Sequence, residues 1–297
     1  MEQLTVDVSS WMVEDEEWLG EQPKLWLSEP NWGPAPQRWL FKPARRGWLP
    51  QRGTGNLLVF HWQDAQSEVI ASQLARTIGL PAAHVVPARR SEERGCISLD
   101  VRATGEAMHS GDTYLSGLAL PGYVPNRERP RNRTGHHLDA IGRVLEGLPG
   151  PRCAGPALAT EIFAGYLVLD AWIANTDRHA ENWALTDDGT TKRLAASFDH
   201  GSSLGAGLDE RGIGSVDPIV FARGGMAQKF DGGRDETLVA LANRALRLWG
   251  GPWLDRLEMV DANHERSIVE RAPGMSDARR TFVGHLLAEN RRRLIES

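Results

Sequence analysis

The amino-acid sequence of 297 residues predicts an α+β protein of two lobes, a small lobe of strands with one helix and then a larger, mostly helical lobe. Three observations support this fold class. Seven of the eleven tryptophans fall in the first 62 residues among many prolines and glycines, which favours short strands separated by turns. One long helical pattern follows at residues 67–78. From residue 157 onward, apolar residues recur mainly at helical spacing.

The small lobe is predicted to span residues 1–105. Its helix can be capped by Ser67 or Asp64, and Gly79 and Pro81 are residues that end a helix. Short apolar or β-branched runs predict extended segments at four places, residues 24–27, 38–42, 84–87 and 96–101.

The larger lobe is predicted to span residues 106–297. The pattern is weak at first, with one helix expected at residues 136–145. Stronger helical patterns follow at residues 157–173, 238–249, 253–260 and 276–295. Residues 174–207 are irregular and polar, and loops held on a rigid scaffold are where catalytic groups concentrate.

The composition excludes several classes of function. A hydrophobic content of 41% with 25% charged residues is typical of a globular protein. The net charge of −5 argues against direct binding of nucleic acid or of an anionic membrane, because such binders are usually basic. The two cysteines lie far apart in the sequence, and no apolar run approaches the roughly 18–20 residues that span a bilayer. With no signal-peptide pattern at the start, these features predict a cytoplasmic protein that does not enter a membrane.

Residues 175–182, Asn-Thr-Asp-Arg-His-Ala-Glu-Asn, carry the most informative pattern. Asp177 and Asn182 lie five residues apart in a polar loop, and Asp199 follows later, directly before a His-Gly pair. One carboxylate can position or deprotonate an attacking hydroxyl, while an amide oxygen and a second carboxylate can hold Mg²⁺ beside phosphates. Kinases use these three roles in this order. Asp177 is therefore the predicted catalytic residue, and Asn182 and Asp199 are the predicted metal ligands.

The same chemistry needs a lysine on a strand to contact the ATP phosphates and a helix glutamate to hold that lysine. Lys42 ends a predicted strand and Glu68 lies at the start of the predicted helix, so both are assigned to nucleotide binding. Among the 34 basic residues only four are lysines, namely Lys24, Lys42, Lys192 and Lys229. This scarcity makes a lysine at the expected position hard to attribute to chance.

Each of these residues alone has a simpler interpretation. An Asp–Asn pair with this spacing is common in turns, and a lysine on an edge strand is usually solvated. A glutamate in the first turn of any helix is favourable. The histidines His61, His179 and His200 are scattered and do not form the pair of a zinc protease. The five roles in the expected order favour phosphoryl transfer over these separate explanations.

The loop of residues 175–182, together with the string Ser-Phe-Asp-His-Gly-Ser-Ser-Leu-Gly at residues 197–205, resembles the HipA-like serine/threonine kinases. That family is distantly related to the phosphoinositide 3/4-kinases, which carry a similar Asp-Arg-His-x-x-Asn string. Residues 39–43 and 67–75 resemble the family's lysine strand and the helix after it. The resemblance covers residues 22–210 and implies a two-lobed protein-kinase-like fold, with ATP and Mg²⁺ or Mn²⁺ in the cleft.

The resemblance further implies transfer of the γ-phosphate to a serine or threonine of a protein substrate, the protein itself being one candidate acceptor. By likeness to the family, Asp177 would be the base or positioning carboxylate and Lys42 would contact the ATP phosphates. His179 would be a structural residue of the loop. Two alternatives stay open, a phosphoinositide or small-molecule kinase and an ATP-binding pseudokinase with a regulatory role.

Two features depart from the family's pattern. The sequence has no Gly-x-Gly-x-x-Gly phosphate loop, and residues 28–33 are the nearest candidate for one. Ser28 would then be the counterpart of a serine that toxins of the family autophosphorylate. The additional N-terminal subdomain with which those toxins engage an antitoxin is not evident. An antitoxin-like partner is thus raised by the resemblance alone.

Overall fold

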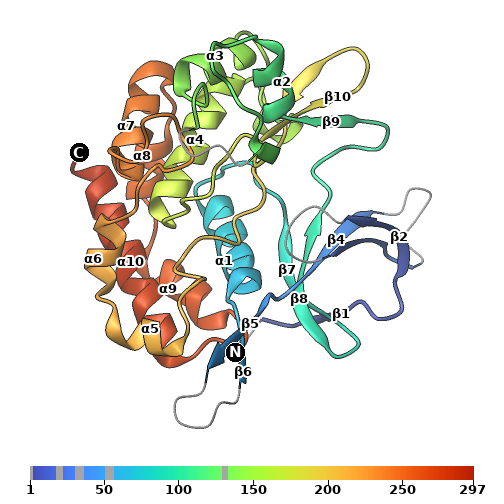
Figure 1. The fold of residues 1–297 in the computed structure, drawn as a ribbon, viewed down its shortest axis with the longest axis vertical. Coiled ribbons are helices and arrows are strands. Elements are labelled where there is room, and N and C mark those ends of the chain that lie inside the picture. The colour runs from blue at the N-terminus through green and yellow to red at the C-terminus, as the bar shows by residue number, and fades with distance from the viewer. Residues whose placement is uncertain (1–2, 18–22, 31–36, 51–56, 129–132) are drawn as a thin grey trace.

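The computed structural model describes residues 3–17, 23–30, 37–50, 57–128 and 133–297. The described chain forms an N-terminal lobe built on a sheet and a C-terminal lobe built of helices (Figure 1). The predicted α+β class, with strands in the smaller lobe and helices in the larger one, is confirmed.

A six-stranded sheet forms the small lobe, in the strand order β1-β7-β8-β4-β3-β2. Its strands are β1 (Val6–Asp7), β2 (Met12–Glu17), β3 (Lys24–Ser28), β4 (Arg38–Pro43), β7 (Val85–Arg90) and β8 (Glu93–Leu99). Neighbouring strands are antiparallel except β1 and β7, which run parallel. Leu25 of β3 pairs with Phe41 of β4, so Lys24 and Lys42 lie at the same end of the two strands.

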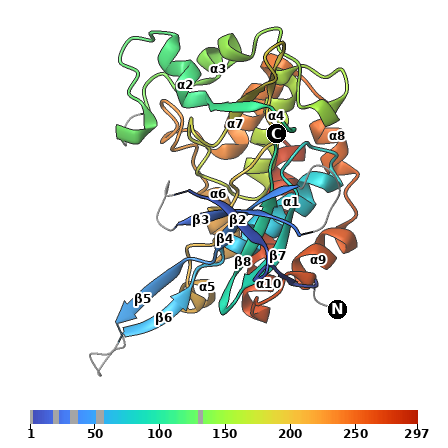
Figure 2. The same cartoon turned by 90° about the vertical axis from the view of Figure 1, so that its right-hand side faces the viewer.

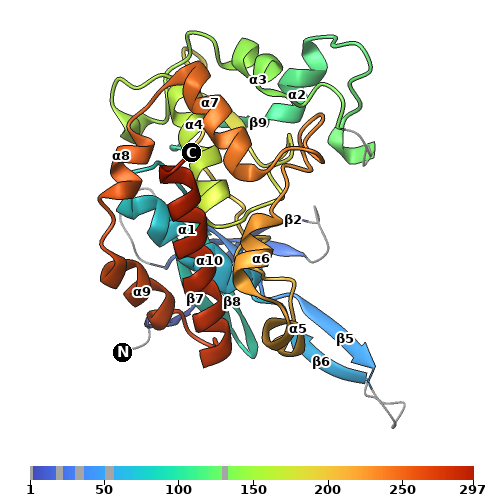
Figure 3. The ribbon, with the colours of Figure 1, turned by 90° about the vertical axis from the view of Figure 1, so that its left-hand side faces the viewer.

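A second hairpin, β5 (Arg46–Pro50) and β6 (Leu57–His61), projects from the small lobe (Figures 2 and 3). The sequence analysis predicted neither this hairpin nor β2. The composition of β2, Met-Val-Glu-Asp-Glu-Glu, explains the omission, because an exposed edge strand lacks the apolar alternation that identifies a half-buried one.

Helix α1 (Asp64–Thr77) lies between the sheet and the helical lobe (Figure 1). Val69 packs with Val85 and Cys96 of the sheet. Ile70 and Leu74 belong instead to the large core that fills the helical lobe. The helix is thus anchored on two sides, which fixes the side chains of its first turns relative to both lobes.

The N-terminus of α1 differs from the prediction. The helix begins at Asp64, its N-cap residue is Gln63, and neither Ser67 nor Asp64 serves as the cap. Asp64 is the first helical residue, and its carboxylate accepts a hydrogen bond of 3.1 Å from Nε of Arg45. The carboxylate of Asp64 therefore binds Arg45, directly before β5, and does not cap the helix.

The helical lobe surrounds α4 (Ala159–Trp172), which is buried along nearly its whole length and packs against α7 and α10. The other helices are α2 (Gly111–Gly117), α3 (Leu138–Leu145), α5 (Glu210–Ser215), α6 (Pro218–Arg223), α7 (Leu238–Trp249), α8 (Trp253–Glu258), α9 (Ala262–Arg271) and α10 (Asp277–Ile295). Two 3₁₀ turns, Asn126–Glu128 and Arg152–Ala154, complete the helical segments among the described residues. A three-stranded sheet covers one side, with β9 (Ala107–Ser110), β10 (Ala184–Asp187) and β11 (Lys192–Leu194).

The five helices predicted in this lobe correspond to α3, α4, α7, α8 and α10. Helix α9 was not predicted, because its sequence offers few apolar residues at helical spacing. In chain order, β8 is the last strand of the six-stranded sheet. The next strand, β9, pairs with β10 of the helical lobe. A division at residues 105/106 stays a prediction. Within the described residues, no helix is long and apolar enough to cross a membrane.

Candidate active site

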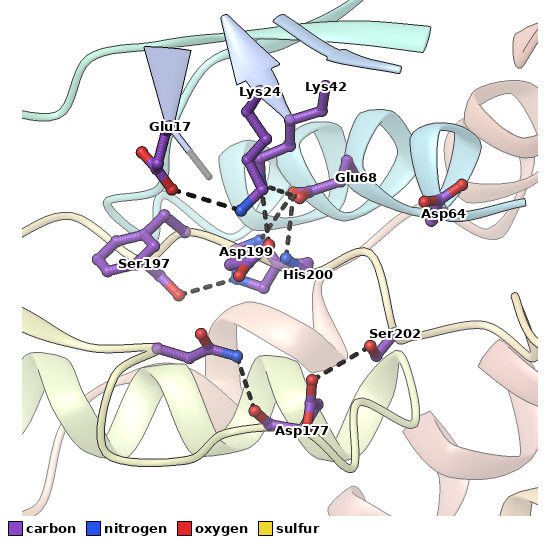
Figure 4. Close-up of polar contacts among 12 residues, drawn as sticks. Glu17, Lys24, Lys42, Asp64, Glu68, Asp177, Ser197, Asp199, His200 and Ser202 are labelled. Carbon is purple, nitrogen blue, oxygen red and sulfur yellow. Dashed lines mark hydrogen bonds and ion pairs between the residues drawn. The ribbon is translucent and has the colours of Figure 1, made fainter. Parts of the chain in front are cut away.

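Lys42 on β4 reaches two carboxylates from different parts of the chain (Figure 4). Its ammonium donates a hydrogen bond to Oε1 of Glu68 on α1 and one of 2.9 Å to Oδ1 of Asp199. The side chain of Glu68 is only 3% exposed. The sheet, α1 and the loop after β11 thereby converge on one charged cluster, and three of the five predicted site residues form it.

Lys42 and Asp199 stabilise each other's charge, whereas burial raises the pKa of Glu68. Burial lowers the pKa of Lys42, but the carboxylates of Asp199 and Glu68 outweigh it and raise that pKa well above the usual value. The ammonium of Lys42 in turn holds the pKa of Asp199 well below its usual range. Lys42 and Asp199 are therefore both charged at neutral pH.

Asp199 has a strained backbone. Its φ of +62° lies in the left-handed region, which is uncommon for residues other than glycine although aspartate tolerates it better than most. The next residue, His200, donates its backbone N–H to Oε2 of Glu68 at 3.1 Å. Strain of this kind persists where the surroundings over-determine the conformation, and such residues cluster at functional sites.

The carboxylate of Asp177 is held at both oxygens. Lys229 Nζ lies 2.8 Å from Oδ1, and the Ser202 hydroxyl donates a hydrogen bond of 3.3 Å to Oδ2. The buried side chain of Asn182 donates from Nδ2 to the backbone carbonyl of Asp177 at 2.8 Å. Asp177 and Asn182 are thus joined by a hydrogen bond across the loop. Because Asn182 uses its amide nitrogen for this bond, its amide oxygen stays available.

A buried ion pair joins the loop of residues 175–182 to helix α4, which precedes it. Arg178 and Asp170 are each 1% exposed, with Nε to Oδ2 at 2.7 Å and Nη2 to Oδ1 at 2.8 Å. Nη1 of Arg178 also donates to the carbonyls of Asn182, at 2.5 Å, and of Phe198, at 3.4 Å. A single guanidinium therefore links the residue Asn182 to the residue that precedes Asp199.

The Lys42–Glu68–Asp199 cluster and Asp177 line a cavity of about 280 Å³. Its lining residues come from the sheet, α1 and both loops: Lys24, Lys42, Pro43, Arg45, Asp64, Ala65, Glu68, Cys96, Asp177, His179, Asp199, Gly201 and Ser202. The sequence-predicted residues Lys42, Glu68, Asp177 and Asp199 all lie at this cavity. Asn182 is not among the lining residues, but its side chain is hydrogen-bonded to the backbone carbonyl of Asp177.

Sequence reasoning missed four residues of the site, namely Lys24, Asp170, Arg178 and Lys229. Lys24 lines the cavity that Lys42 also lines, and its charge adds to the larger effect of Lys42 in lowering the pKa of Asp199, against the opposing effect of burial. The remaining lysine, Lys192, lies 5.5 Å from the ring centre of Tyr114, away from this cavity. Lysine scarcity was the available signal, because three of the four lysines meet at the site.

Ser28 lies at the opposite end of β3 from Lys24, paired with Arg38 and buried. The cavity is lined by Lys24 and not by Ser28. Residues 31–33 of the candidate phosphate loop lie outside the described residues. Residues 18–22, between β2 and β3, also lie outside them, but Glu17 and Lys24 on either side form an ion pair at 3.6 Å (Figure 4).

The donor chemistry of the site fits a magnesium ion that arrives with a nucleotide. Among the described residues, no group of three His, Cys, Asp or Glu side chains could hold a metal by themselves. Mg²⁺ bound with a nucleotide takes only one or two protein oxygens and fills its other positions with phosphates and water. The ionised carboxylate of Asp199 and the amide oxygen of Asn182 are hard oxygen donors of this kind.

A solved structure shares the fold, although no protein-family model and no curated protein matches the sequence. The Helicobacter pylori proinflammatory kinase CtkA aligns with a TM-score of 0.68 and 16% identity over 99% of this chain and 96% of that chain. Hydra Fam20 with sugar gives 0.48 and 13% over 97% and 86%, and Shewanella oneidensis HipA, solved with HipB and operator DNA, gives 0.41 and 12% over 86% and 65%. The likeness to the last two is too low to support a statement about this chain.

The fold is therefore that of a two-lobed, kinase-like protein, as the resemblance of residues 175–182 implied. The particular likeness is to the CtkA kinase, over nearly the whole length of both chains. At 16% identity it shows the fold alone.

Proposed function

We propose that the protein is an ATP- and magnesium-dependent kinase that transfers the γ-phosphoryl group to a serine or threonine hydroxyl of a protein. One observation carries the proposal: the Lys42–Glu68–Asp199 cluster and the carboxylate of Asp177 line the same cavity. Kinase chemistry needs a phosphate-binding cation, a metal-binding carboxylate and an acceptor-binding carboxylate around one space.

Each residue then has a definite role. Lys42, held by Glu68, binds and orients the phosphates of ATP, and Lys24 adds a second cation at the rim of the same cavity. Asp199 and Asn182 are the candidate metal ligands, and the ion, when bound, would neutralise charge that develops on the transferring phosphoryl group. Asp177 orients the acceptor hydroxyl and takes its proton. Catalysis comes mainly from positioning and from charge neutralisation.

The test is phosphate transfer by the purified protein. With ATP and Mg²⁺, phosphate should be incorporated into an added protein acceptor, and Asp177→Ala and Asp199→Ala should each abolish transfer while circular dichroism and thermal unfolding stay close to those of the wild type. Asp188→Ala is a matched control, because this aspartate lies on an exposed turn between β10 and β11. Full activity of either site variant would overturn the proposal.

The same assay, repeated with phosphoinositide and small-molecule acceptors, separates the alternatives. Transfer to a phosphoinositide or a small molecule but to no protein would point to a different acceptor class. Stabilisation by Mg·ATP without turnover would point to a pseudokinase. A cytoplasmic location and an antitoxin-like partner stay predictions and do not enter this test.

A further inference from the structure

Ser202 occupies an unusual position for a surface serine. It lies three residues after Asp199, is exposed, and lines the cavity that holds Lys42 and Asp177. Its hydroxyl points at the carboxylate of Asp177, with Oγ 3.3 Å from Oδ2 (Figure 4). Among the described residues that line the cavity, Ser202 is the one serine, and none is a threonine.

An acceptor hydroxyl in a kinase has to meet two conditions. It must lie within hydrogen-bond reach of the carboxylate that takes its proton, and it must face the space where the γ-phosphate is held. Ser202 meets the first through its bond to Asp177 and the second through its place at the cavity. A serine of the protein thus stands where a substrate serine would have to stand.

Neighbouring serines do not meet these conditions. Ser197 is buried, where Arg178 donates to its Oγ at 3.0 Å and His200 contacts it at 2.8 Å. Ser203 is fully buried, and its Oγ has no hydrogen-bond partner among the described residues. Because Ser202 is exposed at the cavity and the adjacent Ser203 is buried, Ser203 serves as a control for phosphorylation of Ser202.

We propose that Ser202 is the acceptor of an intramolecular phosphoryl transfer that regulates this site. The proposal rests on the proposed kinase function. In the step, Ser202 Oγ attacks the γ-phosphorus of ATP and its proton passes to Asp177. The bond between the γ-phosphorus and the bridging oxygen breaks, its electron pair stays on the β-phosphate, and ADP leaves.

The product would silence the site. Phosphoserine carries a charge of about −1.5 to −2 at neutral pH, and like charge repels it from the carboxylate of Asp177. The ammonium of Lys229, which pairs with Asp177, and those of Lys24 and Lys42, which line the cavity, are cations that can receive it. A phosphate fixed there occupies the space that the γ-phosphate and an external hydroxyl need, so transfer to other proteins should stop.

The experiment follows phosphate in the tryptic peptide of residues 194–211 during incubation of the full chain with ATP and Mg²⁺. This peptide contains Ser197, Ser202 and Ser203, and fragmentation by mass spectrometry distinguishes them. We expect phosphate on Ser202, with a first-order rate constant that is unchanged over a hundredfold range of protein concentration. Ser203→Ala should keep the modification, Ser202→Ala should lose it, and Ser202→Thr should carry it on the new threonine.

Mixing tests whether the transfer stays within one molecule. Asp177→Ala with a mass tag, incubated with untagged wild type, should stay unphosphorylated on Ser202. Phosphate on the tagged chain, or a rate that rises with protein concentration, would overturn the intramolecular step. An unmodified peptide in a wild type that phosphorylates an added protein would overturn the proposal and leave the kinase function standing. If neither transfer occurs, both proposals fail.

Discussion

Lys229 and Asp177 form an ion pair of 2.8 Å, although Lys229 comes from the segment between α6 and α7 and Asp177 from the loop after α4. The backbone of Lys229 is fixed as well, because Nδ1 of the buried His136 donates to its carbonyl at 2.7 Å. The helical lobe thereby delivers a cation to the carboxylate that the proposed reaction uses.

Lys229→Met should lower kcat with little change in the KM for ATP, because Lys229 contacts Asp177 and not the cluster around Lys42. A hydrogen bond to a charged group contributes about 1.5–3 kcal/mol, which corresponds to a loss of roughly 10- to 100-fold. Steady-state kinetics with varied ATP and varied protein acceptor provide the measurement. Lys229→Arg should recover part of the rate.

Lys192→Met is the matched control, because Lys192 lies over Tyr114 and away from the cavity. Its kinetics should equal those of the wild type. A loss in Lys229→Met that appears only in the KM for ATP would contradict the assignment to the acceptor side.

Lys42→Arg should impair the use of ATP even though the charge is kept. The ammonium of Lys42 fits between Glu68 and Asp199, whereas a planar guanidinium is larger and presents its donors in a fixed fork. We expect kcat/KM for ATP to fall by roughly 10²-fold, comparable to the loss of one preorganised charge contact. Unchanged kinetics in this variant, with Lys192→Arg as the control, would remove Lys42 from the nucleotide site.

The sequence predicted those parts of the site that lie in recognisable local patterns. Lys42 closes an apolar strand, Glu68 starts a periodic helix, and the two aspartates flank short polar strings. Their convergence followed from the order of roles that a kinase requires. The structure brings Lys42, Glu68 and Asp199 into direct contact, while the roles assigned to these residues stay proposals.

Two of the missed residues, Lys24 and Lys229, act through contacts between segments distant in the sequence. Lys24 joins the site through the pairing register of β3 and β4, and Lys229 through the packing of the segment before α7. Neither relationship is local, so no periodicity reveals it. Asp170 did leave a signal, because it is the one charged residue in the apolar run from Ile162 to Ile173. A carboxylate inside such a helix needs a buried partner, which is Arg178.

Asp170→Ala should destabilise the fold and reduce activity although Asp170 does not line the cavity. Removing it leaves the guanidinium of Arg178 buried without its carboxylate, a change that costs about 3–5 kcal/mol. The double variant Asp170→Leu/Arg178→Met should lose much less stability than the sum of the losses in Asp170→Leu and in Arg178→Met, because the double variant leaves no unpaired charge. Urea unfolding of the wild type, the two single variants of this pair and the double variant measures the coupling. Strictly additive losses in the free energy of unfolding would contradict it.

His136 should make the protein sensitive to acid. Burial lowers its pKa to about 4, and its neutral ring donates from Nδ1 to the carbonyl of Lys229 while Nε2 accepts from Nε1 of Trp183 at 3.3 Å. A second proton would place two donors against each other at Nε2. The unfolded chain, with a histidine pKa of about 6.5, binds this proton first, so the free energy of unfolding falls as the pH drops from about 6.5 towards 4.

The loss assigned to His136 is roughly 3 kcal/mol between pH 7 and pH 4, at about 1.4 kcal/mol for each pKa unit. Other buried histidines, such as His200, have lowered pKa values too, so the wild type alone does not isolate it. The stability advantage of the wild type over His136→Asn should therefore be measured by urea unfolding at several pH values. It should shrink by that amount towards pH 4, because the asparagine does not titrate. An advantage that stays constant from pH 7 to pH 4 would show that His136 is not held neutral by the fold.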